Sequence, residues 1–159
     1  MGTDLEIQLG EALRERGWTI AFAESCTGGL VGHRMTNIPG SSDYYLGSVT
    51  AYAYNAKEHL LGVEAATLEQ YGAVSKPTVL EMANGIRYAL SADLGISISG
   101  IAGPGGGTTE KPVGLVWIGV SSPDQVKAKR FNFAGERLEV KQQAAEEALR
   151  MALETLEAD

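Results

Sequence analysis

The sequence has only one cysteine and two histidines among its 159 residues. A single cysteine, Cys26, excludes an internal disulfide and favours a reducing compartment. His33 and His59 are isolated, with no HxxxH or CxxC pattern beside them, so we interpret both as solvated or packing residues. The composition therefore predicts neither a disulfide-stabilised fold nor a metal centre.

Long hydrophobic runs are also missing. No apolar stretch approaches the roughly 20 residues that a membrane span needs. Residues 1–6 are acidic and polar, unlike a signal peptide. The formal net charge of −7 argues against a broad contact with a phosphate backbone, although it permits a local anion pocket. We predict a soluble, cytoplasmic protein with no membrane or nucleic-acid partner.

The order of apolar patterns predicts helices alternating with short buried strands. Expected helices are residues 5–16, 28–36, 55–61, 64–72, 75–90 and 136–156, the last with Leu138 inward; expected strands are 18–23, 46–54, 95–99, 115–120 and 126–133. No linker divides the chain, so we expect one domain over residues 1–159. The predicted fold class is α/β: a three-layer α/β/α sandwich with a mixed, mostly parallel sheet and an antiparallel hairpin at 115–133.

Ligands of such sheets bind beyond the carboxyl ends of the strands, which here are the turns at 24–29, 54–57 and 100–107. The first of these turns reads Ser25-Cys26-Thr27-Gly28-Gly29. A strand that turns sharply into a helix would raise Ser25 or Cys26 above the sheet. It would also aim free helical N–H groups at an anion or a developing oxyanion. A plainer interpretation makes Ser25 or Thr27 an N-cap, and Cys26 a small buried hydrophobe.

The second turn and the end of the strand before it hold Tyr52, Tyr54, Asn55 and Lys57. No histidine lies in any of the three turns, so a Ser-His-Asp triad lacks support. Lys57 is an alternative base for Ser25 if a desolvated pocket lowers its pKa. The competing interpretation is a solvated lysine in the first turn of a helix.

The third turn belongs to a glycine-rich loop, Gly103-Pro-Gly-Gly-Gly107-Thr108. It matches neither a P-loop nor a GxGxxG fingerprint. Its backbone N–H groups are candidates for cradling a phosphate or carboxylate, and an ordinary surface turn is the alternative. Arg137 lies in the first turn of the last helix, against the preference of the helix dipole, which makes it a candidate phosphate clamp.

The chain resembles the CinA C-terminal domain family over about residues 5–155, and six motifs in the same order carry the resemblance. They are Ala23-Glu-Ser-Cys-Thr-Gly-Gly-Leu30, Tyr52 to Lys57, Gly72-Ala-Val-Ser75, Gly100-Ile-Ala-Gly-Pro-Gly-Gly-Gly107, Lys111-Pro-Val-Gly114 and Phe133-Ala-Gly-Glu-Arg137. The resemblance implies hydrolysis of the carboxamide of nicotinamide mononucleotide to nicotinate mononucleotide and ammonia, in pyridine nucleotide recycling. It implies no metal or cofactor, and a homodimer or larger assembly.

The resemblance also implies roles for particular residues. Ser25 is the expected nucleophile, Lys57 the base, Tyr52 its assistant and Arg137 a ligand of the substrate phosphate. The remaining expected substrate-binding residues are Thr27, Gly28, Gly29, Asn55, Gly103, Gly105, Gly106 and Gly107. Which of Thr27 and the three consecutive glycines supply oxyanion donors is left open at this point.

One segment departs from the family pattern. The family motif commonly runs Tyr-Ser-Asn-Glu-Ala-Lys, whereas this chain has Ala53 at the serine and Tyr54 at the asparagine. If that asparagine shapes the nicotinamide pocket, activity here is altered or lost. The alternative function is therefore a catalytically weak or inactive nucleotide-binding or partner-docking module, linked to competence or the DNA-damage response.

Overall fold

The computed structural model describes residues 4–158; residues 1–3 and 159 of the expected domain lie outside this range. A five-stranded sheet in the order β2-β1-β3-β4-β5 forms the middle layer. Its strands are β1 (Ile20–Glu24), β2 (Tyr45–Thr50), β3 (Leu94–Gly100), β4 (Leu115–Ser121) and β5 (Val126–Asn132). β1 pairs in parallel with β2 and β3, and the antiparallel β4–β5 hairpin extends the sheet beyond β3.

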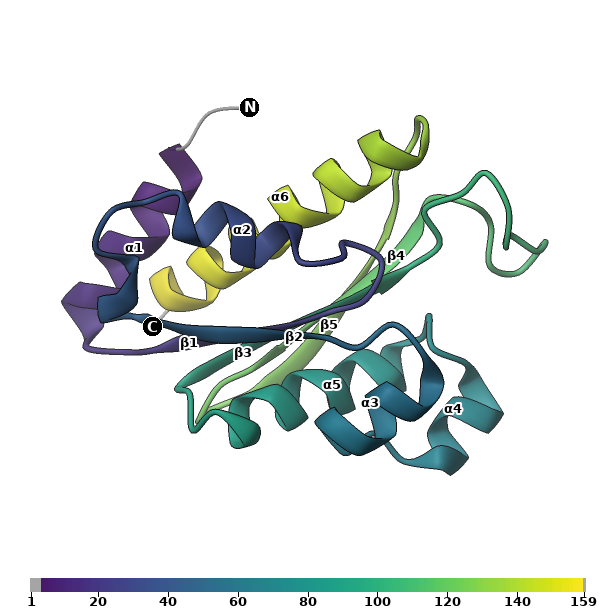
Figure 1. Ribbon diagram of the computed structural model, residues 1–159, viewed down its shortest axis with the longest axis horizontal. Coiled ribbons are helices and arrows are strands. Elements are labelled where there is room, and N and C mark those ends of the chain that lie inside the picture. Colours follow the sequence, from purple (N-terminus) through teal and green to yellow (C-terminus); the bar gives the residue numbers. More distant parts are fainter. Residues whose placement is uncertain (1–3, 159) are drawn as a thin grey trace.

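Helices cover both faces of the sheet, so the predicted three-layer α/β/α sandwich is confirmed (Figure 1). One face carries α1 (Asp4–Arg16), α2 (Leu30–Thr36) and α6 (Arg137–Glu157). The other carries α3 (Tyr54–Leu61), α4 (Ala65–Tyr71) and α5 (Lys76–Ala89). A 3-10 turn, η1 (Ser41–Asp43), leads into β2.

The side chains of β1 contribute to the hydrophobic cores on both faces of the sheet. Ile20 and Phe22 are fully buried in the core beneath α1 and α6, whereas Ala21 and Ala23 belong to the core beneath α5. Side chains alternate between the faces of a strand, so large residues face one layer and small residues face the other. Glu24, the last residue of β1, is also fully buried, which is unusual for a carboxylate.

Three expectations about local structure have clear outcomes. The helix predicted over 75–90 is confirmed as α5, and Ser75 is its N-cap, because its side chain accepts a hydrogen bond from the Thr78 N–H. The strand predicted over 46–54 is wrong at its end: β2 stops at Thr50, the chain turns, and α3 begins at Tyr54. Leu138 was expected inward but is 69% exposed, because the buried face of α6 begins only at Val140.

Candidate active site

The turn after β1 is organised by Glu24, which the sequence analysis did not single out. Its carboxylate accepts hydrogen bonds from the N–H groups of Gly29 (3.1 Å), Val31 (3.0 Å) and Gly32 (3.0 Å), and from the Thr27 hydroxyl (2.6 Å). The carboxylate therefore satisfies orphan donors at the start of α2 and places negative charge at the positive end of that helix.

This arrangement corrects two expectations. Neither Ser25 nor Thr27 caps α2. The N-cap residue is Gly29, with φ 101°, which has no side chain to form a capping hydrogen bond. The N–H groups of Gly29 and Val31 do not await a ligand either, because Glu24 already occupies them. What the turn does provide is a fixed position for Ser25, whose backbone is tied to the turn by the Gly28 N–H.

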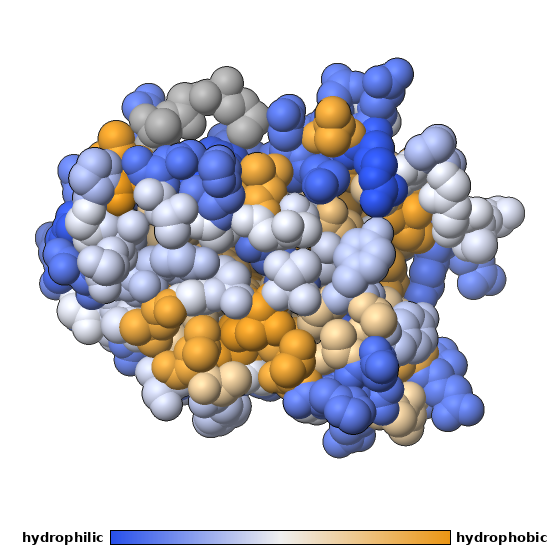
Figure 2. Space-filling model, viewed as in Figure 1, coloured by the Kyte–Doolittle hydropathy of each residue, from blue (hydrophilic) through white to orange (hydrophobic). Residues whose placement is uncertain are grey.

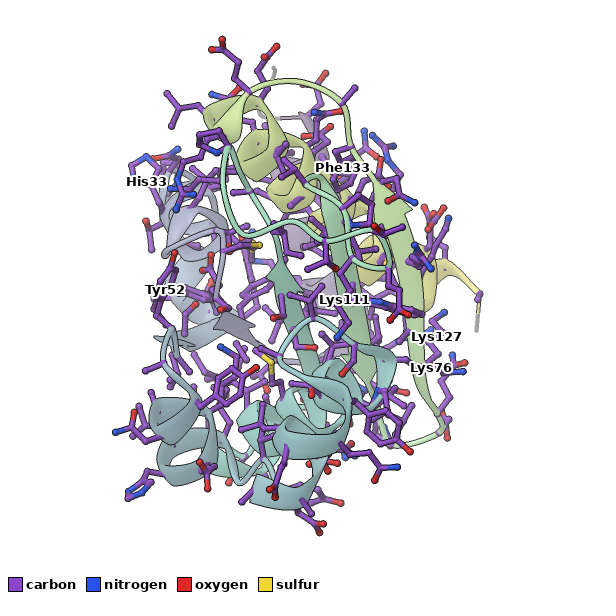
Figure 3. All side chains as sticks on the ribbon, turned by 90° about the vertical axis from the view of Figure 1, so that its right-hand side faces the viewer. His33, Tyr52, Lys76, Lys111, Lys127 and Phe133 are labelled. Atoms are coloured by element: carbon purple, nitrogen blue, oxygen red, sulfur yellow. The ribbon has the colours of Figure 1, made fainter. Side chains whose placement is uncertain are left out.

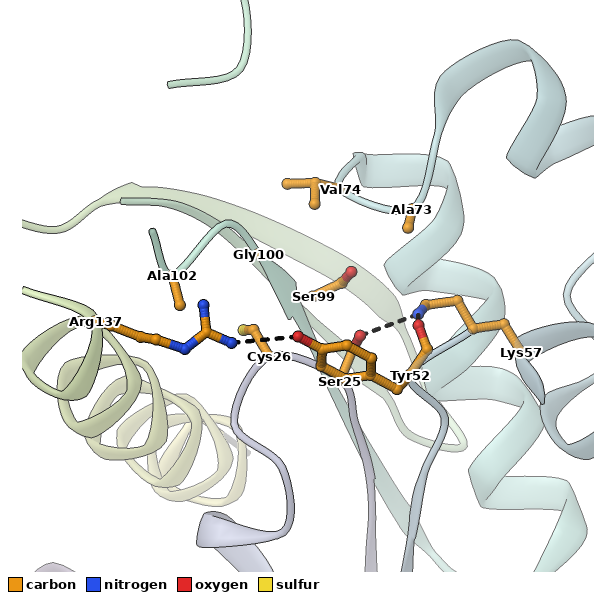
Figure 4. A pocket seen from close by; sticks show the side chains of 10 residues that line it. All are labelled: Ser25, Cys26, Tyr52, Lys57, Ala73, Val74, Ser99, Gly100, Ala102 and Arg137. Atoms are coloured by element: carbon orange, nitrogen blue, oxygen red, sulfur yellow. Dashed lines mark hydrogen bonds between the residues drawn. The ribbon is translucent and has the colours of Figure 1, made fainter. Parts of the chain in front are cut away.

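Ser25 lies at the wall of a pocket of about 170 Å³ between the two helical layers (Figure 4). The pocket is lined by residues from five segments: Ser25, Cys26, Tyr52, Lys57, Ala73, Val74, Ser99, Gly100, Ala102 and Arg137. It opens beyond the carboxyl ends of β1 and β3, where the sequence predicted a ligand site. The serine is only 7% exposed, so a substrate must enter the pocket to reach its hydroxyl.

Lys57 is the second element of the site. Its Nζ donates hydrogen bonds to Ser25 Oγ (3.0 Å), to Ala51 O (2.8 Å) and to Tyr52 O (3.0 Å), as Figure 4 shows for the first of these. The residue is 1% exposed, and within residues 4–158 no carboxylate lies at ion-pair distance from it. The interpretation as a solvated lysine is therefore wrong.

Burial without a counter-ion changes the acidity of this lysine. Desolvation lowers the Lys57 pKa from 10.5 to about 8, because the charged form loses its hydration. A neutral amine has two N–H groups and one lone pair in tetrahedral directions. The carbonyls of Ala51 and Tyr52 take the two N–H groups, which leaves the lone pair facing Ser25 Oγ. This is the geometry that a general base for a serine requires.

Cys26 lines the same pocket but has the opposite acidity. Its side chain is 6% exposed, and burial raises the pKa of the thiol to about 12. Because the thiolate is the reactive form of cysteine, Cys26 is inert at neutral pH. The structure supports its interpretation as a small buried hydrophobe.

Tyr52 and Arg137 connect three segments across the mouth of the pocket. Arg137 donates from Nη1 to Gly103 O (2.7 Å) and from Nη2 to the Tyr52 hydroxyl (3.3 Å). Tyr52 thus offers its carbonyl to Lys57 and its hydroxyl to Arg137, rather than its hydroxyl to the base. Arg137 and Ala102 also line an adjoining pocket of about 530 Å³, so the guanidinium stands where the two pockets meet.

Several predicted binding residues lie outside the lining of the pocket at Ser25. Asn55, Gly105, Gly106 and Gly107 are exposed, and Gly103 contributes a carbonyl to Arg137 rather than a free N–H. Thr27 and Gly29 bond to Glu24, and Gly28 lies beside Lys141. The lining residues that sequence reasoning missed are Ala73, Val74, Ser99, Gly100 and Ala102. Their signal was positional: Ser99 and Gly100 end β3, Ala102 follows it, and Ala73 and Val74 belong to the Gly72–Ser75 motif.

Tyr54 does not line the pocket, but it contacts the Ala73–Val74 segment, which does. The Ala73 N–H donates to the Tyr54 hydroxyl (3.3 Å), and Lys111 Nζ donates to Tyr71 O across the same loop. Figure 3 views the molecule from this end and labels Tyr52 and Lys111. The departure from the family motif therefore acts on the Ala73–Val74 wall and not directly on Ser25.

Two negative findings apply to residues 4–158. No three histidine, cysteine, aspartate or glutamate side chains gather to hold a metal, and both histidines are exposed. No helix in this range is long and apolar enough to cross a membrane.

A family profile and the sequences of similar proteins all indicate the same family. Residues 2–156 match the profile of the CinA C-terminal domain. The chain is 48% identical to a protein of Enterobacter agglomerans named nicotinamide-nucleotide amidohydrolase PncC, over 94% of this chain and 92% of that protein. It is 52% identical to a CinA-like protein of Salinibacter ruber, over 96% of this chain. The chain spans only 37%, 39% and 33% of the length of three such longer relatives.

Solved structures agree with the fold. A CinA superfamily protein from Klebsiella pneumoniae superposes with a TM-score of 0.96 at 35% identity, over 100% of both chains. A CinA superfamily protein from Escherichia coli gives a TM-score of 0.92 at 31% identity, over 95% of this chain and 88% of that one.

Proposed function

The chain belongs to the CinA C-terminal domain family, and on this premise we propose that it hydrolyses the carboxamide of nicotinamide mononucleotide to nicotinate mononucleotide and ammonia. The observation that carries the proposal is the 3.0 Å contact between Ser25 Oγ and Lys57 Nζ in a pocket that buries both residues. The name of the relative from Enterobacter agglomerans supports the choice of substrate.

In the acylation step, neutral Lys57 accepts the proton of Ser25 Oγ as this oxygen attacks the carboxamide carbon. The ammonium then donates this proton to the amine of the tetrahedral intermediate, the C–N bond breaks, and ammonia leaves. An ester between Ser25 and the nicotinoyl group remains. In the second step Lys57 takes a proton from water, hydroxide attacks the ester, and the proton returns to Ser25 Oγ as nicotinate mononucleotide is released.

The oxyanion of each intermediate needs donors that are not already engaged. Gly29 and Val31 N–H groups bond to Glu24, so they do not serve. We assign this role to the Ser99 hydroxyl, which lines the pocket at the end of β3 and points into it in Figure 4. A hydroxyl donor in a dry pocket stabilises developing negative charge more than the same donor in water.

Tyr52 and Arg137 have positioning and binding roles in this proposal. The Tyr52 carbonyl fixes Lys57, and its hydroxyl accepts from Arg137. With the carboxamide at Ser25, the ribose phosphate extends toward the junction of the two pockets, where Arg137 lies. A planar guanidinium suits phosphate oxygens.

The proposed reaction is tested by ammonia release from nicotinamide mononucleotide, with Lys57→Met compared with the wild type. Lys76→Met, which changes an exposed lysine at the start of α5, is the matched control. We expect turnover by the wild type and the control. Loss of general-base catalysis should slow Lys57→Met by a factor on the order of 100 to 10,000. Tight binding of the nucleotide without turnover by the wild type would instead favour the docking-module alternative.

Assembly into a homodimer or larger oligomer is part of the proposal. The edge strand β2 carries no charged residue and exposes Leu46, whereas the opposite edge strand β5 carries Lys127, Lys129 and Arg130. Charged edge strands resist pairing with another chain, and uncharged ones permit it. In the space-filling view, apolar surface gathers below the centre of the molecule, next to the place where β2 runs in Figure 1 (Figure 2). The net charge of −7 supports the absence of a nucleic-acid partner.

A further inference from the structure

A second cation from α6 lies beside the catalytic turn. Lys141 is one helical turn after Arg137, so the two side chains project from the same face of the helix. A Cβ atom added to Gly28 would lie 3.7 Å from Lys141 Nζ, which places this ammonium against the turn that carries Ser25. Lys141 is half-buried. Its positive charge acts on the thiol of Cys26, a residue of the pocket wall, in the direction that lowers the pKa of that thiol.

Neither cation is neutralised by the protein. Within residues 4–158, no carboxylate lies at ion-pair distance from Arg137 or Lys141. The two acids at the start of α6 are directed at the backbone: the N-cap residue Glu136 and Glu139 in the first turn form a reciprocal capping box. In a protein with a net charge of −7, Arg137 in the pocket wall and Lys141 beside the turn that carries Ser25 are two cations without acidic partners, and they are suited to bind an external anion.

The neighbouring helix terminus does not compete for that anion. The N-terminus of α2 is a ready-made anion site in principle, but the Glu24 carboxylate already bonds to Gly29, Val31 and Gly32. Anion binding at this side of the pocket therefore falls to side chains. Arg137 has five N–H donors, and the structure engages two of them, with Gly103 O and the Tyr52 hydroxyl.

We propose that Lys141 completes, with Arg137, a subsite for the phosphate monoester of the substrate, and so makes the enzyme prefer the nucleotide over the nucleoside. The inference rests on the proposed function, because it names a contact of the same substrate. Arg137 supplies a directional fork and Lys141 a mobile point charge, which together balance a phosphate dianion.

The test compares Lys141→Met with the wild type on two substrates, nicotinamide mononucleotide and nicotinamide riboside, which lacks the phosphate. Loss of a charge-assisted contact should lower kcat/KM for the nucleotide on the order of 10- to 100-fold, chiefly through KM. The change for the riboside should be much smaller. Lys141→Arg should retain most of the preference, and Lys76→Met, which lies on α5, should change neither value. Equal losses on both substrates, or no loss on the nucleotide, would overturn the subsite.

Calorimetry separates failure of the subsite from failure of the proposed reaction. Nicotinate mononucleotide is titrated into the wild type and Lys141→Met, with nicotinate riboside as the reference ligand. If the wild type releases no ammonia but binds the nucleotide at least tenfold more weakly after Lys141→Met, the reaction is wrong and the subsite stands. If the variant binds both ligands as the wild type does, the subsite is wrong whatever the reaction.

Discussion

Titration of Lys57 should govern how the reaction rate depends on pH. With a pKa of about 8, the lysine is neutral in about 1% of molecules at pH 6, about 9% at pH 7 and half at pH 8. Only the neutral amine accepts the proton of Ser25 Oγ. The value of kcat/KM for nicotinamide mononucleotide should therefore rise about tenfold per pH unit below pH 7.5, about 50-fold between pH 6 and 8, and level off above pH 8.

The assay is initial-rate ammonia release at subsaturating substrate from pH 5.5 to 9.5, at constant ionic strength. The substrate phosphate loses its second proton near pH 6, so the profile for nicotinamide riboside, which has no phosphate, is the control. The residual rate of Lys57→Met should not show the rise. A wild-type profile that is flat between pH 6 and 8, or that falls in this window, would refute the role of Lys57 as the base.

The same titration predicts a change in stability. The folded-state pKa of about 8 lies below the ordinary value of 10.5, so between these values the unfolded chain binds more protons than the folded one, and stability rises with pH. The full penalty below pH 8 is about 3 kcal/mol, from 2.5 pKa units at 1.36 kcal/mol each. Relative to Lys57→Met, the wild type should gain about 2 kcal/mol from pH 7 to 9.5 in urea denaturation. Parallel stability curves would contradict this.

Three further substitutions test the surroundings of the dyad. Glu24→Gln replaces a carboxylate that accepts four hydrogen bonds by an amide that accepts fewer. Urea denaturation should show that the free energy of unfolding falls by about 2–4 kcal/mol, and an unchanged midpoint would refute the capping role. Cys26→Ala should keep its rate within a few-fold, because the thiol does not ionise near neutral pH; complete loss of ammonia release with an intact fold would restore Cys26 as a nucleophile. Tyr54→Phe removes the acceptor of the Ala73 N–H, so KM for nicotinamide mononucleotide should rise a few-fold with little change in kcat. An unaltered KM would show that this hydrogen bond does not shape the pocket wall.

The layer architecture was predictable because hydrophobic pattern fixes it. β1 is apolar from Ile20 to Ala23 and buried on both faces, as a central parallel strand must be. The antiparallel hairpin predicted at 115–133 is confirmed as β4 and β5, because the four residues Ser122–Gln125 between them are too few for a parallel crossover. The end of β2 was not predictable, because the aromatic and apolar pattern continues through Tyr52 and Tyr54 although the chain has already turned.

The site was predictable only in part, because its contacts join residues far apart in the sequence. Ser25 and Lys57, which 32 positions separate, were paired because the expected topology brings their turns to one edge of the sheet, and the family resemblance implied their roles. The contact from Arg137 to Tyr52 spans 85 positions. Glu24 escaped notice for another reason: its side chain folds over the turn to reach donors five to eight residues ahead, beyond the spacing of ordinary caps. The glycine loop was a candidate anion cradle, but Gly105, Gly106 and Gly107 are exposed, and the buried Gly103 offers its carbonyl to Arg137.

The central claim, that Ser25 is the nucleophile of an amidohydrolase, is tested most directly by ammonia release from nicotinamide mononucleotide with Ser25→Ala beside the wild type. Circular dichroism and urea denaturation verify that the variant is folded. We expect turnover by the wild type and a loss on the order of 1,000-fold or more in the variant, because the attacking oxygen is gone. A folded Ser25→Ala protein that releases ammonia at the wild-type rate would contradict the account.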